Sequence, residues 1–162
     1  PWSRPHVTQS YVFQCGGEGW LALHMSSPPK FWENLAAAVG RPDMLDMPQF
    51  ATREARIAHY EDVVAFLAPI FATRDRDSWC AELEAREVPH SPVRTSAEVA
   101  ASAQAEALGL IVEDPDGPHG AFRTVRSPVS FDGERMSRVA APPVLGADNE
   151  RIVAPLRDAS KG

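Results

Sequence analysis

The sequence contains few lysines and few cysteines, and it has no long hydrophobic run. Lys30 and Lys161 are its only lysines, and 22 acidic residues outnumber 16 basic ones, which gives a formal net charge of −6. Proteins that bind the phosphate backbone of nucleic acids present a basic surface, and anionic membranes attract basic segments for the same reason. We therefore expect neither nucleic acid nor a membrane among the partners of this chain.

The same shortages argue against secreted and membrane-spanning classes. No apolar stretch approaches the ~20 residues of a transmembrane helix, and the first residues lack the apolar core of a signal peptide. Cys15 and Cys80 lie far apart in an acidic chain, which is typical of reduced thiols and not of a disulfide framework. We expect a cytoplasmic protein. Its 162 residues, 44% of them hydrophobic, suffice for a globular core.

Recognisable motifs for metal and cofactor sites are also missing. No two histidines have the spacing of a helical zinc site, and the sequence has no C-x-x-C, no G-x-S-x-G and no nucleotide-binding glycine pattern. We expect no metal and no tightly bound cofactor. His90 lies between Pro89 and Pro92, where a histidine either hydrogen-bonds a ligand or fills a turn. The residues alone predict an α+β domain without an evident active site.

The β-structure is predicted as two hairpins. Residues 10–15 and 20–24 are rich in strand-forming residues, and the four residues between them include three glycines, which supply the positive φ of a tight turn. A glycine-rich turn that cradles phosphate is followed by a helix, whereas residues 20–24 predict a strand. Residues 110–112 and 121–125 flank a segment rich in Gly and Pro and predict the second hairpin. Residues 88–93 are expected to form an extended loop, because prolines disfavour helical backbone before them.

Apolar residues at helical spacing predict several helices, whose aromatic side chains we expect in the core. Capping residues and glycines mark their ends. The predicted helices are one opened by Ser27 and closed by Gly40; one from Arg53 to Ala68 with a kink or stop at Pro69; one capped by Asp75 and continuing to Arg86; short turns from Thr95 to Leu108, opened by a Thr95–Glu98 capping box and closed by Gly109; and a terminal helix capped by Asp148.

An ordered series of short motifs extends over nearly the whole chain: Tyr11-Val12-Phe13-Gln14-Cys15, Gly19-Trp20-Leu21-Ala22-Leu23, Phe31-Trp32, Val39-Gly40-Arg41-Pro42, Pro48-Gln49-Phe50, Arg53 and Arg56, Trp79 and Leu83, Val88-Pro89-His90-Ser91-Pro92-Val93, Ala97-Glu98-Val99, Leu108-Gly109-Leu110, Ser127-Pro128-Val129-Ser130-Phe131 and Ala141-Pro142-Pro143-Val144-Leu145-Gly146. Each motif is weak by itself. In this order and spacing, the series resembles the C-terminal part of family III CoA-transferases, the formyl-CoA and carnitine CoA-transferase-like group.

The resemblance implies a particular α+β fold. Members of this family combine a large Rossmann-like domain with a smaller α+β domain, and two subunits interlock. On that pattern residues 1–9 are a connecting segment and residues 10–108 are the small domain, a β-hairpin and antiparallel strands packed with several short helices. Residues 109–162 are connecting strands and a C-terminal tail that returns to the large domain, which is missing here. A homodimer is expected, as is a companion that supplies the N-terminal half, on the same longer chain or on a second one.

The implied chemistry moves CoA between an acyl-CoA thioester and a carboxylic acid through an anhydride formed on an aspartate. That nucleophile belongs to the family's N-terminal half, which nothing in this sequence matches, so we assign no catalytic residue here and expect the chain alone to be inactive. Arg4 and His6 fall near a segment that closes over substrate in the family and are the candidate substrate-binding residues; a frayed terminus is the alternative. An acyl-CoA racemase fragment and a non-catalytic binding or dimerisation module are the alternative functions.

Overall fold

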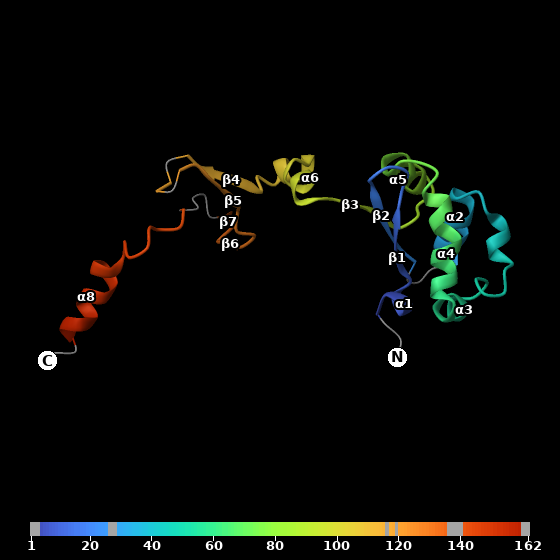
Figure 1. Cartoon of the computed structure of the whole chain (residues 1–162), viewed down its shortest axis with the longest axis horizontal. Coiled ribbons are helices and arrows are strands. Elements are labelled where there is room, and N and C mark those ends of the chain that lie inside the picture. Colours follow the sequence, from blue (N-terminus) through green and yellow to red (C-terminus); the bar gives the residue numbers. More distant parts are fainter. Residues whose placement is uncertain (1–3, 26–28, 116, 119, 136–140, 160–162) are drawn as a thin grey trace. The chain divides into compact units, whose positions relative to one another are not determined.

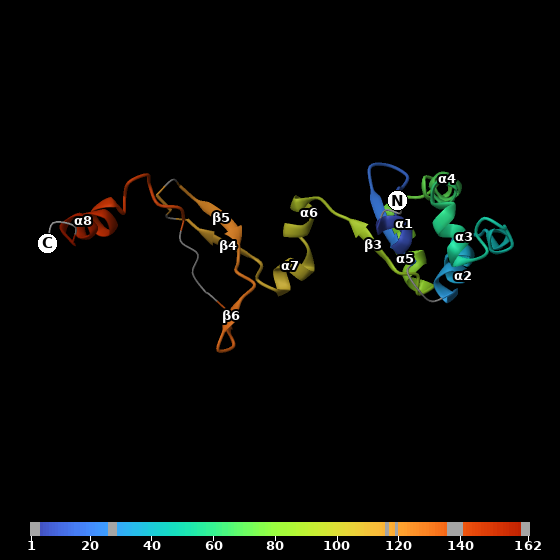
Figure 2. The same ribbon diagram turned by 90° about the horizontal axis from the view of Figure 1, so that it is seen from below.

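The computed structural model describes residues 4–25, 29–115, 117–118, 120–135 and 141–159. The chain forms two compact units, residues 1–94 and residues 95–162. Helices and antiparallel strands occur in both units (Figures 1 and 2). The predicted α+β class is therefore confirmed.

The first unit is built around a three-stranded antiparallel sheet in the order β1-β2-β3. Strands β1 (Ser10–Gln14) and β2 (Trp20–His24) form the predicted hairpin, with Phe13 opposite Leu21. Gly17, in the turn, has a φ of +83°, which a residue with a Cβ adopts only with strain. The glycine-rich segment therefore serves the hairpin, as predicted.

The third strand, β3 (His90–Val93), was not predicted. It pairs with β2 so that Pro92 lies opposite Leu21, whereas the prolines of residues 88–93 predicted an extended loop. The strand lies at the edge of the sheet, where a residue without an N–H group is tolerated because its outer side has no partner strand. The prediction of extended backbone was correct, and the assignment to a loop was wrong.

Six helical segments among the described residues accompany the sheet: α1 (Arg4–Thr8), α2 (Pro29–Ala38), the 3-10 helix η1 (Pro42–Leu45), α3 (Arg53–Ala58), α4 (Tyr60–Phe71) and α5 (Arg76–Ala85). Gly40, with a φ of +67°, ends α2, and the N–H of Arg41 reaches back to the carbonyl of Ala36 at 2.9 Å. That is a Schellman motif. Asp75 caps α5 by accepting a hydrogen bond from the Ser78 N–H at 2.8 Å. Both predicted ends are confirmed, whereas the predicted cap Ser27 lies outside the described residues.

The predicted helix 53–68 is interrupted at a different place from the one expected. His59, with φ −108° and ψ 35°, separates α3 from α4, and α4 continues through Pro69 to Phe71. A proline removes one hydrogen bond and crowds the preceding turn, but Pro69 is followed by only two more helical residues. At the break, His59 Nδ1 lies 2.7 Å from Asp62 Oδ2, and this local pairing accompanies the new helix start.

The core of the first unit lies between one face of the sheet and the helices. Tyr11, Phe13, Leu21 and Leu23 point inward from β1 and β2 and are at most 2% exposed. The ring of Phe13 stacks on Phe71 with centroids 4.7 Å apart, and Phe71 meets Trp79 edge-on at 5.0 Å. Both geometries are favourable for aromatic pairs, so β1, α4 and α5 are joined through one aromatic chain.

The second unit contains four short strands and three helices among its described residues: α6 (Ser96–Ala100), α7 (Ala103–Ala107), β4 (Ile111–Asp114), β5 (Phe122–Val125), β6 (Ser130–Phe131), β7 (Glu134–Arg135) and α8 (Asn149–Ala159). Strands β4 and β5 form the second predicted hairpin, and the Thr95–Glu98 capping box opens α6 as predicted. The terminal helix begins directly after Asp148.

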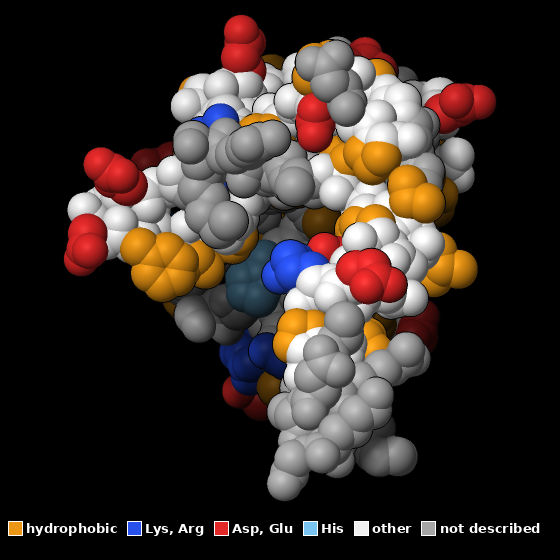
Figure 3. Space-filling view, turned by 90° about the vertical axis from the view of Figure 1, so that its left-hand side faces the viewer, with side chains coloured by type: hydrophobic (Ala, Val, Ile, Leu, Met, Phe, Trp, Pro, Cys, Tyr) orange, Lys and Arg blue, Asp and Glu red, His pale blue; other side chains and the backbone are white. Residues whose placement is uncertain are grey.

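The two units differ in how much apolar surface they bury. Among the described residues of the second unit, Ala105 is the single buried hydrophobic residue. Larger apolar side chains remain on its surface, namely Val99, Leu108, Val125, Val129, Phe131, Val144, Leu145 and Ile152. Figure 3 shows hydrophobic side chains, in orange, on the molecular surface between acidic ones in red. Within the described part of the chain, no helix is both long and apolar enough to cross a membrane.

Candidate functional site

The two predicted substrate-binding residues lie together on α1. Arg4 is exposed, and His6 is half-buried because its ring packs on the ring of Tyr60 at a centroid distance of 4.1 Å. The Nε2 atom of His6 lies 3.7 Å from Oε1 of Glu61, and Tyr60 in turn donates a hydrogen bond to the Ser10 carbonyl at 2.7 Å. Helix α4 thus holds His6 in place beside β1, while the Arg4 side chain faces solvent.

A second group of polar side chains, which the sequence did not predict as a group, lies in the interior of the same unit. Arg56 of α3 is 7% exposed and Gln9 is fully buried. The Nε of Arg56 donates to Oε1 of Gln9 at 2.8 Å, its Nη1 donates to the Phe50 carbonyl at 2.8 Å, and its Cζ lies 4.6 Å from the centre of the Trp32 ring. Burial lowers the pKa of Arg56, and the three contacts offset part of that cost.

Several polar atoms of this interior group have no partner. Nε2 of Gln9, the hydroxyl of Tyr11 and Nε1 of Trp32 are buried without a hydrogen bond. Burial raises the pKa of Tyr11 above its usual range, so the hydroxyl keeps its proton and remains a donor. Gln9 also has a φ of +46°, which costs energy for a residue with a side chain. Unsatisfied buried donors and local strain are features that often mark functional sites.

One signal in the sequence points to Arg56. The buried residues of α4 are Val63, Leu67 and Phe71, and counting back from Val63 in helical steps of three and four passes Tyr60 and reaches Arg56. A charged residue in phase with an apolar stripe predicts a buried, partnered cation. The groups around it come from Gln9 just before β1, from Phe50 just before α3 and from Trp32 of α2, and no local pattern predicts that meeting.

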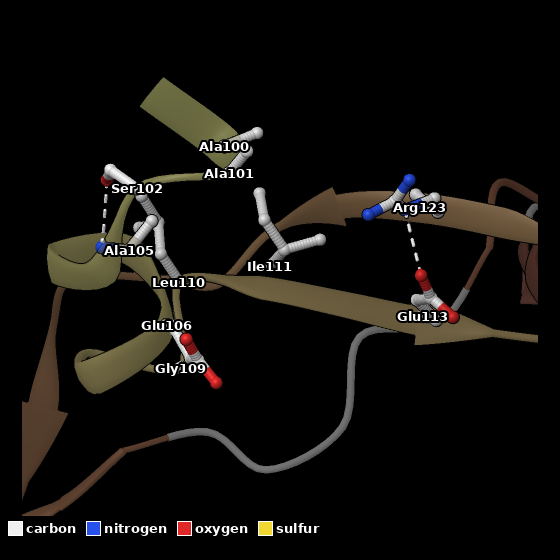
Figure 4. Close-up of a pocket in the computed structure, with 10 residues that line it drawn as sticks. All are labelled: Ala100, Ala101, Ser102, Ala105, Glu106, Gly109, Leu110, Ile111, Glu113 and Arg123. Carbon is white, nitrogen blue, oxygen red and sulfur yellow. Dashed lines mark hydrogen bonds and ion pairs between the residues drawn. The ribbon is translucent and has the colours of Figure 1, made fainter. Parts of the chain in front are cut away.

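Two cavities elsewhere in the chain are lined by charged side chains or histidines that are already bound to neighbouring groups. In the second unit, a cavity of about 420 Å³ lies against α6, α7, β4 and β5 (Figure 4). Its charged side chains include Arg123, whose Nε is paired with Glu113 at 2.8 Å. In the first unit, a cavity of about 380 Å³ is lined by His24 and His90. His90 Nδ1 lies 2.8 Å from the carbonyl of Val88, so this ring is bound to its own segment, which favours the structural interpretation of His90.

The described residues offer little for metal or thiol chemistry. No group of three or more His, Cys, Asp or Glu side chains among them is placed to hold a metal ion. Cys15 is buried and Cys80 half-buried, both as free thiols. Burial raises the pKa of both thiols, whereas a nucleophilic cysteine needs a lowered pKa.

Comparison with known proteins covers nearly the whole chain. Residues 3–149 match the model of CoA-transferase family III. A formyl-CoA:oxalate CoA-transferase of Escherichia coli O157:H7 is 28% identical over 151 residues, which are 90% of this chain and 36% of the relative. The Streptomyces avermitilis protein of the same name is 28% identical over 124 residues, 76% of this chain and 30% of the relative.

Solved structures agree in fold. A CAIB/BAIF family protein from Brucella suis matches 94% of this chain and 39% of its own with a TM-score of 0.72 at 24% identity. The hypothetical protein Rv3272 from Mycobacterium tuberculosis matches 90% of this chain and 39% of its own with a TM-score of 0.70 at 22% identity. This chain thus spans about a third of the length of the curated relatives it matches. The family match over most of its residues shows that the chain belongs to CoA-transferase family III.

Proposed function

We propose that this chain is the C-terminal part of a CoA-transferase that moves CoA between an acyl-CoA thioester and a carboxylic acid. The observation that carries the proposal is the family match over residues 3–149. The second unit supports it, because Ala105 is its one buried hydrophobic residue among those described. A unit with so small a core needs apolar surface from elsewhere, and the rest of a transferase would supply it.

The reaction proceeds by covalent catalysis on a carboxylate outside this chain. An aspartate oxygen attacks the thioester carbonyl, a C–O bond forms, the C–S bond breaks and CoA leaves as the thiolate. The thiolate then attacks the aspartyl carbonyl of the resulting anhydride, which releases the donor acid and leaves an enzyme thioester. The acceptor carboxylate attacks this thioester and expels the thiolate again, which attacks the acceptor's carbonyl to give the new acyl-CoA and the free aspartate.

Arg4 and His6 are the residues of this chain that we propose contact substrate. A guanidinium offers bidentate hydrogen bonds to a carboxylate or a phosphate, and Arg4 is exposed at the start of α1. His6, two residues further along α1, is held in place by the Tyr60 ring. No tightly bound cofactor is needed, since the CoA thioester is itself the substrate. The assembly we propose is a cytoplasmic homodimer, with the N-terminal half on the same longer chain or on a companion chain.

Activity measurements test the assembly. The purified chain should exchange no CoA between an acyl-CoA and acceptor acids, whereas adding the proposed N-terminal half should restore exchange. Arg4→Gln should then weaken substrate binding in the restored assembly. Arg151→Gln is the matched control, because the Arg151 side chain is 73% exposed on α8 and paired with Asp148. Turnover by the chain alone that survives stringent purification would refute the proposal.

Calorimetric titration with CoA separates the transferase from a binding module. The arginines of this chain are dispersed over many elements, and strong phosphate binding needs convergent donors. We therefore expect poor CoA binding by the isolated chain and tight binding after the N-terminal half is added. Micromolar CoA binding that the second half leaves unchanged would instead identify an independent binding module.

A further inference from the structure

We propose that the cavity beside Arg56 in the first unit binds a small organic monocarboxylate. Among the described residues, this cavity of about 340 Å³ is lined by Trp32 and Glu33 of α2, by Arg53 and Arg56 of α3, and by Pro29, Leu45, Ala51 and Thr52. Its size lies at the lower end of the range for small-molecule sites. Ligand binding at this site does not depend on the proposed transferase reaction.

The charge of the cavity favours an anion. Arg56 is 7% exposed, and none of the ion pairs between described residues includes it. Its Nε and Nη1 are bound to Gln9 and Phe50, which leaves Nη2 for a ligand. A buried cation without a counter-ion is costly, so an anion that binds there replaces a missing partner.

The neighbouring donors favour the same ligand. Trp32 is 4% exposed, lines the cavity and has an unpartnered Nε1–H group. Arg53 lies three residues before Arg56 on α3, so the two side chains share a face of the helix, and its Nη2 is bound to the Val7 carbonyl at 2.7 Å. The Trp32 Nε1–H is itself fully buried and does not face the cavity, so the two guanidinium groups are the donors that can serve the two oxygens of a carboxylate.

The remaining lining selects among anions. Pro29, Leu45 and Ala51 are apolar, and together with the Trp32 ring they suit an alkyl or aryl body attached to the carboxylate. Glu33 also lines the cavity, and its negative charge disfavours a ligand with a second negative charge. The cavity thus suits butyrate or benzoate better than inorganic phosphate or succinate.

The test is a titration of the full chain followed by ¹H–¹⁵N NMR. Butyrate and benzoate should shift the Trp32 indole N–H resonance in a saturable way, with phosphate and succinate binding at least about tenfold more weakly. Trp32→Phe identifies that resonance by its loss. Arg53→Gln should weaken butyrate binding about tenfold, because a hydrogen bond to a charged group contributes about 1.5–3 kcal/mol.

A control comes from a second arginine that also packs on a tryptophan ring, although it is exposed where Arg56 is buried. Arg74 lies over the Trp79 ring at 4.6 Å, the same distance as Arg56 over Trp32, and it does not line the cavity. Arg74→Gln should leave butyrate binding unchanged. Three results would overturn the proposal: the absence of a saturable shift, equal binding of phosphate, or equal weakening by Arg74→Gln.

Discussion

The replacement of Phe71 by alanine tests whether the aromatic chain holds the first unit together. Phe71 is fully buried at the end of α4, between Phe13 of β1 and Trp79 of α5. Its carbonyl also accepts the Trp79 Nε1–H hydrogen bond at 2.9 Å, and that bond survives the substitution because it uses the backbone. Phe71→Ala therefore removes packing alone and leaves a cavity among three elements.

The expected loss is large compared with the stability of the unit. A buried Phe→Ala change costs about 3–5 kcal/mol, and the two ring pairs place this site in the upper half of that range. A unit of 94 residues has a free energy of unfolding of roughly 5–14 kcal/mol. With a urea m-value of about 1.5 kcal/mol/M, a loss of about 4 kcal/mol lowers the unfolding midpoint by about 2–3 M.

Tryptophan fluorescence measures this unit specifically, because all four tryptophans lie within residues 1–94. Phe131→Ala is the control, since Phe131 is 68% exposed on β6. This substitution should change the free energy of unfolding by less than about 0.5 kcal/mol. If Phe71→Ala cost less than about 1 kcal/mol, or no more than Phe131→Ala, the aromatic chain would not hold the core and the reasoning would be refuted.

Three further outcomes follow from local contacts. Hydrogen bonds from Ser78 lower the pKa of Asp75 in the folded protein. The stability that these bonds give is complete above the ordinary carboxyl pKa, and it is lost as the pH falls through the lowered pKa of the folded state. The gap in urea midpoint between wild type and Asp75→Ala should therefore narrow from pH 7 to about pH 3; a constant gap would contradict this. Gly40→Ala should cost about 1 kcal/mol in urea unfolding, and Gly40→Asn less, because Asn tolerates positive φ. Thr95→Ala should speed hydrogen exchange in α6 through loss of a cap worth about 1 kcal/mol, whereas Thr95→Ser should not.

The elements that the sequence predicted well are those set by neighbouring residues. Gly17 of the first turn, Gly40 after α2 and the Thr95–Glu98 pair each act through backbone geometry within a few residues. Such effects can be predicted from the sequence without knowledge of the fold. The pairing of β3 with β2 joins residues about 70 positions apart, and only the sheet reveals why a proline is acceptable in β3.

The candidate sites were predictable to a smaller extent. The family resemblance led to Arg4 and His6, whose role in binding stays a prediction, and the structure adds that Tyr60 packs against His6. The interior group around Arg56 escaped prediction because Gln9 lies just before β1, Trp32 lies on α2 and Arg56 lies on α3. Hydrophobic periodicity describes one helix at a time, whereas such a group forms only after three elements have packed.

The proline on β3 also bears on the behaviour of this protein at high concentration. Free sheet edges recruit strands from other molecules, and this is a common start of aggregation. The Pro89 carbonyl accepts a bond from the His24 N–H, and the antiparallel alternation then turns the backbone groups of Pro92 away from β2, toward the open edge. An incoming strand meets no donor at Pro92, so its ladder is broken at that residue. The residue that obscured this strand in the sequence thus protects the finished sheet against self-association at that edge.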